Sequence, residues 1–329
     1  MANATTEPAS NVIKLDGRRD KADSLLRITI RRFLRHRMAV AGLIILSFVI
    51  LYVSVGALIY SESYANKTSL TEKNSPPSFA PVTREDGSIN LPNYLGTDRL
   101  GRDILSRTIY GGQISLLIGI SAVTISITIG TIVGLVSGYF GGLIDAILMR
   151  FVEAMLAIPS LILLIVIQPV LIKNSTSTIN LFGRQLSITV LAIVIIIGIF
   201  SWLGLSRIVR SMVLSLKEQE FVTAARMVGA SNSRIIFTHI LPNCIAPIVV
   251  TATLGVGNAI VTETALGFLG FGVQEPTATW GNVLSGARQF VDEYPWIWMA
   301  PGLLITLTVL SINFIGDGLR DALDPRSQR

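Results

Sequence analysis

Few residues in this chain could do covalent, redox or metal chemistry. The histidines are His36 and His239, and the one cysteine is Cys244. A single cysteine excludes a disulfide framework within the chain, and with two distant histidines it makes a poor ligand set for a metal. The sequence also lacks the Gly-x-x-x-x-Gly-Lys-Ser/Thr loop that cradles nucleotide phosphates,. We therefore expect no catalytic residue and no cofactor bound by this chain.

Two acidic residues stand out because they occur within long apolar runs. Glu153 lies in the run 147–172, three residues after Arg150, and Glu263 lies in the run 243–268. An ionisable side chain inside a membrane is costly unless it faces protein or water. Arg150 is the natural i, i+3 partner of Glu153 on a helix, which favours a structural ion pair over a gating role. For Glu263 the alternatives are contact with a helix of a partner and a place on the wall of a pathway through the membrane.

Residues 215–242 carry the pattern of a short helix on which another protein could dock. Ser215 and Glu218 fit a capping box and predict a helix start,. Gly229 sits where a left-handed glycine would end that helix. A second helix is expected to begin near Ser231 or Ser233. An amphipathic helix lying on the membrane or on its own bundle is the alternative to docking.

The docking face itself follows from helical spacing. Phe221, Ala224, Ala225 and Val228 fall at i, i+3, i+4 and i+7, on one side of the helix,. Because the alanines keep this side low, a partner surface could approach closely.

The elements that must position these residues are membrane helices. Half of the 329 residues are hydrophobic, 15% are charged, and the mean hydropathy is +0.61. The apolar residues come in runs of about the 20 residues that cross a bilayer. We predict an all-α polytopic fold with six transmembrane helices, at about 38–60, 110–139, 147–172, 186–205, 243–268 and 298–315. Pro159 is expected only to kink the third span.

Glycines and charges mark two further features of the second span. Gly130, Gly134 and Gly138 form a small-residue stripe, which predicts close packing inside one bundle, with a dimer interface as the alternative,. Arg99, Arg102 and Asp103, just before this span, are expected to cap or clamp its outer start.

Basic residues set the predicted orientation. With both termini in the cytoplasm, most of the 27 lysines and arginines fall on the inner side, as the positive-inside rule requires. The organisation is then a basic cytoplasmic tail (1–37), a first helix (38–60), an extracytoplasmic loop (61–109), a core of five helices (110–316) with an inner loop at 206–242, and a cytoplasmic tail (317–329). The positive charge is a topology signal, so nucleic-acid binding is not expected.

Several motifs resemble one transporter family when taken together. Ala224-Ala225, three residues, Gly229 and then Leu241-Pro242 are similar to the "EAA" loop of ABC importer permeases, although Thr223 stands where that family usually has Glu. The segments 95–107, 268–281 and 316–326 resemble the C-type permease subunit of the dipeptide, oligopeptide and nickel permeases. The likeness covers about residues 25 to 326.

The resemblance implies a type I ABC importer fold in a bacterial cytoplasmic (inner) membrane. It implies that the helix 215–231, through Phe221, Thr223, Ala224, Ala225, Val228 and Gly229, couples to ATPase subunits. The implied partners are a homologous B-type permease, two ATPase subunits that bind ATP and Mg²⁺, an extracytoplasmic peptide-binding protein and the lipid bilayer. The implied substrate is a di- or oligopeptide.

Three alternatives stay open. The same architecture could import nickel-chelate complexes or glutathione. A secondary transporter would work without ATPases, but it would favour an internal repeat or a charged relay across several spans, and we identify neither. A membrane-embedded enzyme would need clustered catalytic groups at one depth, which two distant histidines do not supply.

Overall fold

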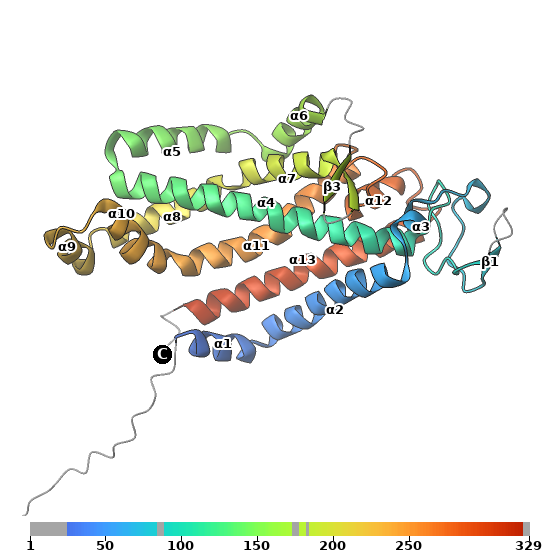
Figure 1. Ribbon diagram of the computed structural model, residues 1–329, viewed down its shortest axis with the longest axis horizontal. Helices are drawn as coiled ribbons and strands as arrows, with labels where there is room; N and C mark the ends of the chain where they lie inside the picture. The colour runs from blue at the N-terminus through green and yellow to red at the C-terminus, as the bar shows by residue number, and fades with distance from the viewer. Residues whose placement is uncertain (1–24, 84–88, 173–177, 182–183, 325–329) are drawn as a thin grey trace, which may run out of the picture.

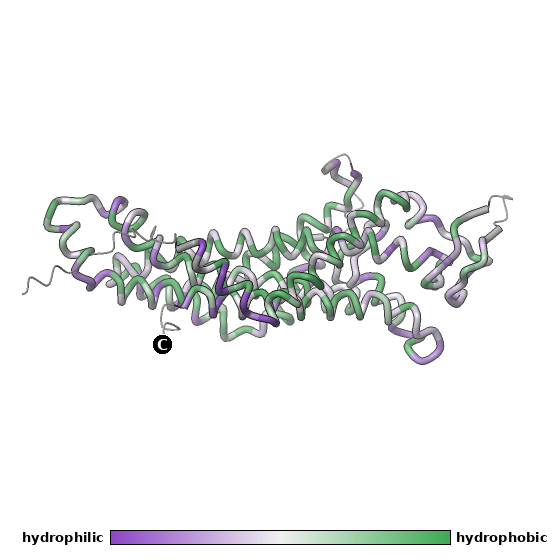
Figure 2. Tube along the Cα trace, turned by 90° about the horizontal axis from the view of Figure 1, so that it is seen from below, coloured by the Kyte–Doolittle hydropathy of each residue, from purple (hydrophilic) through white to green (hydrophobic). Residues whose placement is uncertain are grey.

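The chain forms an elongated bundle of helices (Figure 1). The structure, a computed structural model, describes residues 25–83, 89–172, 178–181 and 184–324. Apolar residues dominate the middle of the bundle, and polar residues are more frequent toward its ends (Figure 2). Within the described residues five helices are long and apolar enough to cross a membrane, and a bent pair makes up to six. The polytopic membrane fold predicted from hydropathy is therefore confirmed.

Most of the predicted spans appear as single long helices. They are α2 (Arg37–Ile59), α4 (Ile104–Phe140), α11 (Leu241–Phe268) and α13 (Trp296–Leu323). The fourth span is a helix pair, α7 (Ile188–Ser201) and α8 (Leu203–Leu216), which together are long enough to cross the membrane once.

The shorter elements connect and cap these spans. They are α1 (Leu25–Arg35), α3 (Glu62–Asn66), η1 (Leu70–Glu72), α9 (Glu220–Met227), α10 (Asn232–Arg234), the π-helix η2 (Ile235–Ile240) and α12 (Trp280–Gly286). The fold is not purely α-helical. Strand β1 (Val82–Thr83) pairs antiparallel with β2 (Ile89–Asn90), and β3 (Thr178–Leu181) pairs antiparallel with β4 (Arg184–Ser187).

The third span is broken, and the expectation of a simple kink at Pro159 is wrong. Helix α5 (Gly142–Leu156) ends before Pro159 and α6 (Ser160–Ile172) starts after it. The two helices meet at an angle of 88°. Proline has no N–H to continue the helix and disfavours helical geometry at the preceding residue. The break thus divides the span into two arms that pack on different neighbours.

The fourth span extends further than hydropathy predicts. Helix α8 continues to Leu216, beyond the predicted end at residue 205, so the first part of the inner loop 206–242 is helical. Val209 and Val213 are fully buried on α8, and this inward-facing row carries the helix past the apolar run. Helix α13 likewise continues to Leu323, through most of the predicted C-terminal tail.

The glycine stripe of α4 packs inside the chain, against α8. A Cβ atom at Gly134 would lie 2.6 Å from Cβ of Val209, and one at Gly138 would lie 2.7 Å from Cβ of Val213. Only glycine permits this approach, because real Cβ atoms do not come so close. The prediction of packing within one bundle is confirmed.

The two ends of the bundle differ in what they carry. Helix α9, helix α1 and the C-terminal end of α13 lie at one end, whereas α3 and β1 lie at the other (Figure 1). We refer to these as the α9 end and the α3 end. The arrangement brings both ends of the described chain to the same end as α9.

The charged motif before α4 organises the α3 end. Asp103 caps α4 by accepting a hydrogen bond from the backbone N–H of Ser106 (2.7 Å). The Arg102 guanidinium pairs with Asp98 (2.7 Å) and with Glu275 (2.8 Å), which lies between α11 and α12. Arg102 and Asp103 therefore clamp and cap the start of the second span, as predicted.

Candidate functional site

Helix α9 projects from one end of the bundle and begins later than predicted (Figure 1). Its N-cap is Gln219, and its first residue is Glu220. Ser215 belongs to α8 instead, where its hydroxyl donates to the carbonyl of Ser211. The capping-box start at Ser215 and Glu218 is wrong because the buried row of α8 continues through this point. The predicted docking residues nevertheless remain on or directly after α9.

The predicted stop at Gly229 is confirmed. Gly229 adopts φ +82°, a left-handed conformation. Its N–H donates to the carbonyl of Arg226, and the next N–H, of Ala230, donates to the carbonyl of Ala225. This is the Schellman pattern that satisfies carbonyls at a helix end. Ser231 then accepts a hydrogen bond from the N–H of Arg234 and caps the following helix, at one of the two predicted positions.

One side of α9 is fastened to the bundle. Val222 is 0% exposed and sits in a cluster of buried side chains, and Ala225 is partly buried against the same cluster. We call it the α9-end cluster; its members are Leu135, Leu205, Val209, Val213, Val222, Ile235, Ile236, Ile240, Cys244 and Ile248. Phe221 is half-exposed beside the ring of His239, with centroids 6.5 Å apart. The cluster fixes which side of α9 faces away from the protein.

The outer side of α9 includes Glu220, Thr223, Ala224, Met227 and Val228, all of which are exposed. Met227 is 81% and Val228 is 89% exposed, although both side chains are apolar. The spacing predicted Phe221, Ala224, Ala225 and Val228 on one face, but Ala225 turns toward the bundle. Sequence analysis missed Val222 as the anchor and Met227 on the outer side. The i, i+3 pair Val222–Ala225 is the signal that pointed to an inner row.

Glu153 lies on the surface of α5 and pairs with Arg150, as predicted. Their side-chain N and O atoms are 3.5 Å apart, and the two side chains are 62% and 85% exposed. Glu153 also borders a cleft of about 550 Å³ between α5 and α8. The cleft is lined by Met149, Glu153, Gly204, Arg207, Ile208, Arg210 and Ser211. A gating role for Glu153 stays a prediction.

Glu263 is enclosed by its own chain. It is 0% exposed, and its carboxylate accepts a hydrogen bond from the Ser115 hydroxyl (3.0 Å). That hydroxyl oxygen also accepts from the backbone N–H of Trp280 (3.2 Å). The arrangement joins α11, α4 and α12. In this conformation neither a substrate nor a second subunit can reach Glu263, so its surroundings favour a structural tie over a place on a pathway wall.

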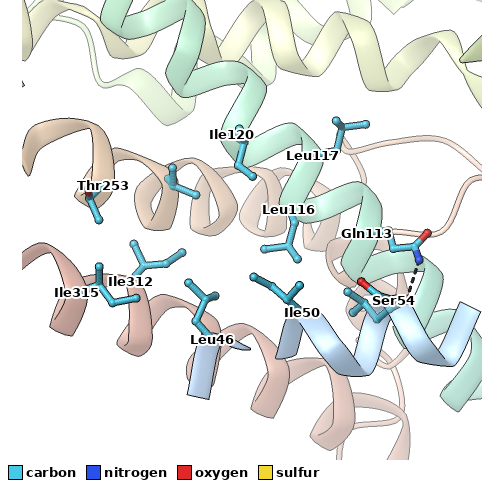
Figure 3. A pocket seen from close by; sticks show the side chains of 12 residues that line it. Leu46, Ile50, Ser54, Gln113, Leu116, Leu117, Ile120, Thr253, Ile312 and Ile315 are labelled. Atoms are coloured by element: carbon cyan, nitrogen blue, oxygen red, sulfur yellow. Dashed lines mark hydrogen bonds between the residues drawn. The ribbon is translucent and has the colours of Figure 1, made fainter. Parts of the chain in front are cut away.

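A cavity of about 610 Å³ lies between α2, α4, α11 and α13 (Figure 3). Among the described residues no charged side chain lines it, and Gln113 at one end is engaged, donating to the carbonyl of Val53 (2.7 Å). Its walls are Leu46, Ile50, Val53, Ser54, Gln113, Leu116, Leu117, Ile120, Thr253, Val256, Ile312 and Ile315. A peptide would have to strip water from its charged ends to enter such a space. The cavity is thus unsuited to a hydrophilic substrate.

Comparison with known proteins identifies the family. Residues 130–329 match the binding-protein-dependent transport system inner membrane component. The chain belongs to this permease family. Residues 24–77 of the permease also match the N-terminal transmembrane domain of oligopeptide transport permease C. The resemblance to C-type peptide permeases is therefore confirmed.

Curated relatives of the permease carry peptide-transport names. It is 42% identical to the dipeptide transport system permease protein DppC of Alkalihalophilus pseudofirmus, over 91% of this chain and 90% of the relative. It is 40% identical to the oligopeptide transport system permease protein OppC of Haemophilus influenzae, over 96% and 92%. For OppC of Bacillus subtilis the identity is 38%, over 94% and 92%. These relatives are peptide permeases by name, and the permease shares their family.

Proposed function

We propose that this permease forms half of the translocation pathway of an ATP-driven, binding-protein-dependent importer of di- or oligopeptides, and that α9 is its coupling helix. The observation that carries the proposal is the outer side of α9. Two large apolar side chains, Met227 and Val228, are almost fully exposed there, next to the small residue Ala224. Exposed apolar groups beside a low surface are typical of a docking site.

The anchoring of α9 supports a role in passing on force. Val222 holds the helix to the α9-end cluster, which includes residues of α4, α8 and α11. A push on the outer side is therefore borne by three spans rather than by a loose loop. In the proposed mechanism, ATP binding closes the ATPase subunits, the coupling helices move together and the pathway opens outward. Hydrolysis then resets it.

The remaining partners are those that membership of the permease family implies. The walls of the cavity in Figure 3 are mostly aliphatic, so we place the peptide pathway between this permease and a homologous B-type permease. The broken third span offers exposed aliphatic side chains for that contact, among them Ile162, Val166 and Val170. ATP and Mg²⁺ belong to two ATPase subunits, and an extracytoplasmic binding protein delivers the peptide.

The family supports placing the permease in a bacterial inner membrane, and charge supports an orientation with the α9 end in the cytoplasm. Helix α1, at this end, contains Arg27, Arg31, Arg32 and Arg35, and Arg37 begins α2. Clusters of arginine beside a first span stay on the cytoplasmic side.

Cysteine labelling and co-purification test the proposal together. The native Cys244 is buried, so it should contribute little background labelling. We expect an impermeant maleimide to label Leu70→Cys in intact spheroplasts, but Met227→Cys only after permeabilisation. ATPase subunits should co-purify with the permease in mild detergent. Labelling of Met227→Cys from outside, or peptide uptake by proteoliposomes that lack ATPases, would contradict the assignment.

A further inference from the structure

An ion pair between α5 and α8 joins the broken third span to the region of α9. We propose that Asp145 and Arg210 are positioning residues that lock α5 to α8, so that a displacement of α9 is passed to the first arm of the third span. The inference rests on the proposed function, in which α9 receives the force. It assigns a transmission role to two residues outside the coupling helix.

The geometry of the pair is that of a fixed connection. The Arg210 guanidinium binds the Asp145 carboxylate through two bonds, Nε to Oδ1 (2.5 Å) and Nη2 to Oδ2 (2.6 Å). The hydroxyl of Ser137, on α4, also bonds to Asp145 Oδ1. One carboxylate thereby joins three helices. Two parallel bonds restrict rotation as well as distance, which a single contact does not.

Burial separates this pair from an ordinary surface salt bridge. The Arg210 and Asp145 side chains are 32% and 17% exposed. The other ion pair on α5, Arg150–Glu153, is highly exposed and lies within one helix. Exposed pairs contribute little, and a pair inside one helix cannot move a second helix. Arg150–Glu153 therefore serves as a matched control on the same helix.

Arg210 is close to α9 in the chain, and the segment that follows α9 is also bonded to the bundle. Helix α8 ends at Leu216, and α9 begins at Glu220. After α9, the Asn232 side-chain oxygen is 2.8 Å from the hydroxyl of Tyr139, near the end of α4. The glycine stripe already packs α4 tightly on α8. Segments α4, α8, α9 and α10 consequently form one block at the α9 end.

The ion pair fixes the start of α5 to this block, and the buried Met149 and Val152 hold the middle of α5 against the start of α8. The break at Pro159 leaves α6 outside the block. Asp145 is in the first turn of α5, about 16 Å from the break at roughly 1.5 Å per residue. Helix α6 instead contributes Leu164 to a different cluster, which includes Ile193 and Ile197 of α7. A pull at Asp145 therefore acts at the far end of α5 and can swing it about the break, as hinges do.

The test uses the whole transporter, with both permeases, the ATPases and the binding protein, in proteoliposomes with tri-alanine as the transported probe. We compare Asp145→Asn, Arg210→Gln and the exchange Asp145→Arg with Arg210→Asp. We expect ATP hydrolysis to continue in each single variant. The number of peptides moved per ATP should fall about tenfold, within the range of measured couplings between sites. The exchanged pair should recover part of the loss, and Arg150→Gln, which breaks the exposed pair on α5, should match the wild type.

A cross-link separates transmission from mere stability. With Asp145→Cys and Arg210→Cys, a short cleavable bis-thiosulfonate reagent bridges α5 and α8 in protein that is already assembled. We expect bridging to restore transport per ATP and reductive cleavage to abolish it again. Unchanged transport per ATP in Asp145→Asn, or a bridge that restores nothing, would overturn this inference alone. A wild-type complex in which peptide uptake does not depend on ATP would instead overturn the proposed function.

Discussion

Truncating the outer side of α9 should weaken the binding of the ATPase subunits. Met227 and Val228 are 81% and 89% exposed in the single chain, so nearly all of both side chains is available for burial at an interface. Burying one CH₂ group contributes about 0.8 kcal/mol, so Val228→Ala forfeits about 1.6 kcal/mol and Met227→Ala about 2 kcal/mol on complete burial. Allowing for incomplete burial, the double variant should lose about 3 kcal/mol, a roughly hundredfold weaker association.

The assay is titration of fluorescently labelled ATPase subunits with detergent-solubilised permease, before and after the double substitution. Leu70→Ala is the matched control, because Leu70 is also apolar and 78% exposed but lies in η1, the element that follows α3. Because both α9 side chains are exposed, the free energy of unfolding of the isolated double variant should lie within about 0.5 kcal/mol of the wild-type value. An affinity within about threefold of the wild type, near 0.6 kcal/mol, would show that the ATPase does not dock on this surface.

Three further outcomes concern the scaffold behind that surface. Glu263→Ala removes the buried acceptor of the Ser115 hydroxyl and should lower the free energy of unfolding by about 1–3 kcal/mol. Glu263→Gln should retain most of the wild-type stability. Equal melting temperatures of Glu263→Ala and the wild type in detergent would contradict the structural role of this hydrogen bond. Gly134→Ala should push α4 away from α8 and lower the free energy of unfolding by about 1–3 kcal/mol. Gly204→Ala is the control, because a Cβ atom there meets nothing within 4 Å, and it should be tolerated. Equal effects of the two substitutions would refute the packing argument. Gly229→Ala places an alanine in a left-handed conformation, which costs about 1–2 kcal/mol. The amide hydrogens of α9 should therefore exchange faster than in the wild type, and unchanged exchange would argue against this strain.

Local rules are sufficient for the features of this chain that depend on neighbouring residues. A run of about 20 apolar residues must cross or leave the membrane wherever the rest of the chain lies, so the long helices follow from hydropathy. The stop at Gly229 and the cap at Ser231 depend only on backbone geometry within one turn. The motifs that indicated the permease family are also contiguous.

Local rules fail where a local signal competes with burial against another helix. Ser215 and Glu218 do form the pattern of a helix start, but α8 passes through Ser215 because Val209 and Val213 are buried against α4. Ala225 has the spacing of an outward face, but the α9-end cluster draws its side of the helix inward. Burial against a partner helix outweighs a cap in both cases.

The polar contacts that hold the spans together are made by residues far apart in the chain. Glu263 meets Ser115 across 148 positions, and Arg210 meets Asp145 across 65. Hydropathy places a charge at a depth in the membrane, but it does not state which way the side chain points. The direction of an acidic side chain is decided only when the helices pack. Burying a charge without a partner is costly, so the packing that gives the carboxylate a hydrogen-bond donor is favoured. The break at Pro159 is of the same kind, since its 88° angle depends on the separate neighbours that hold α5 and α6.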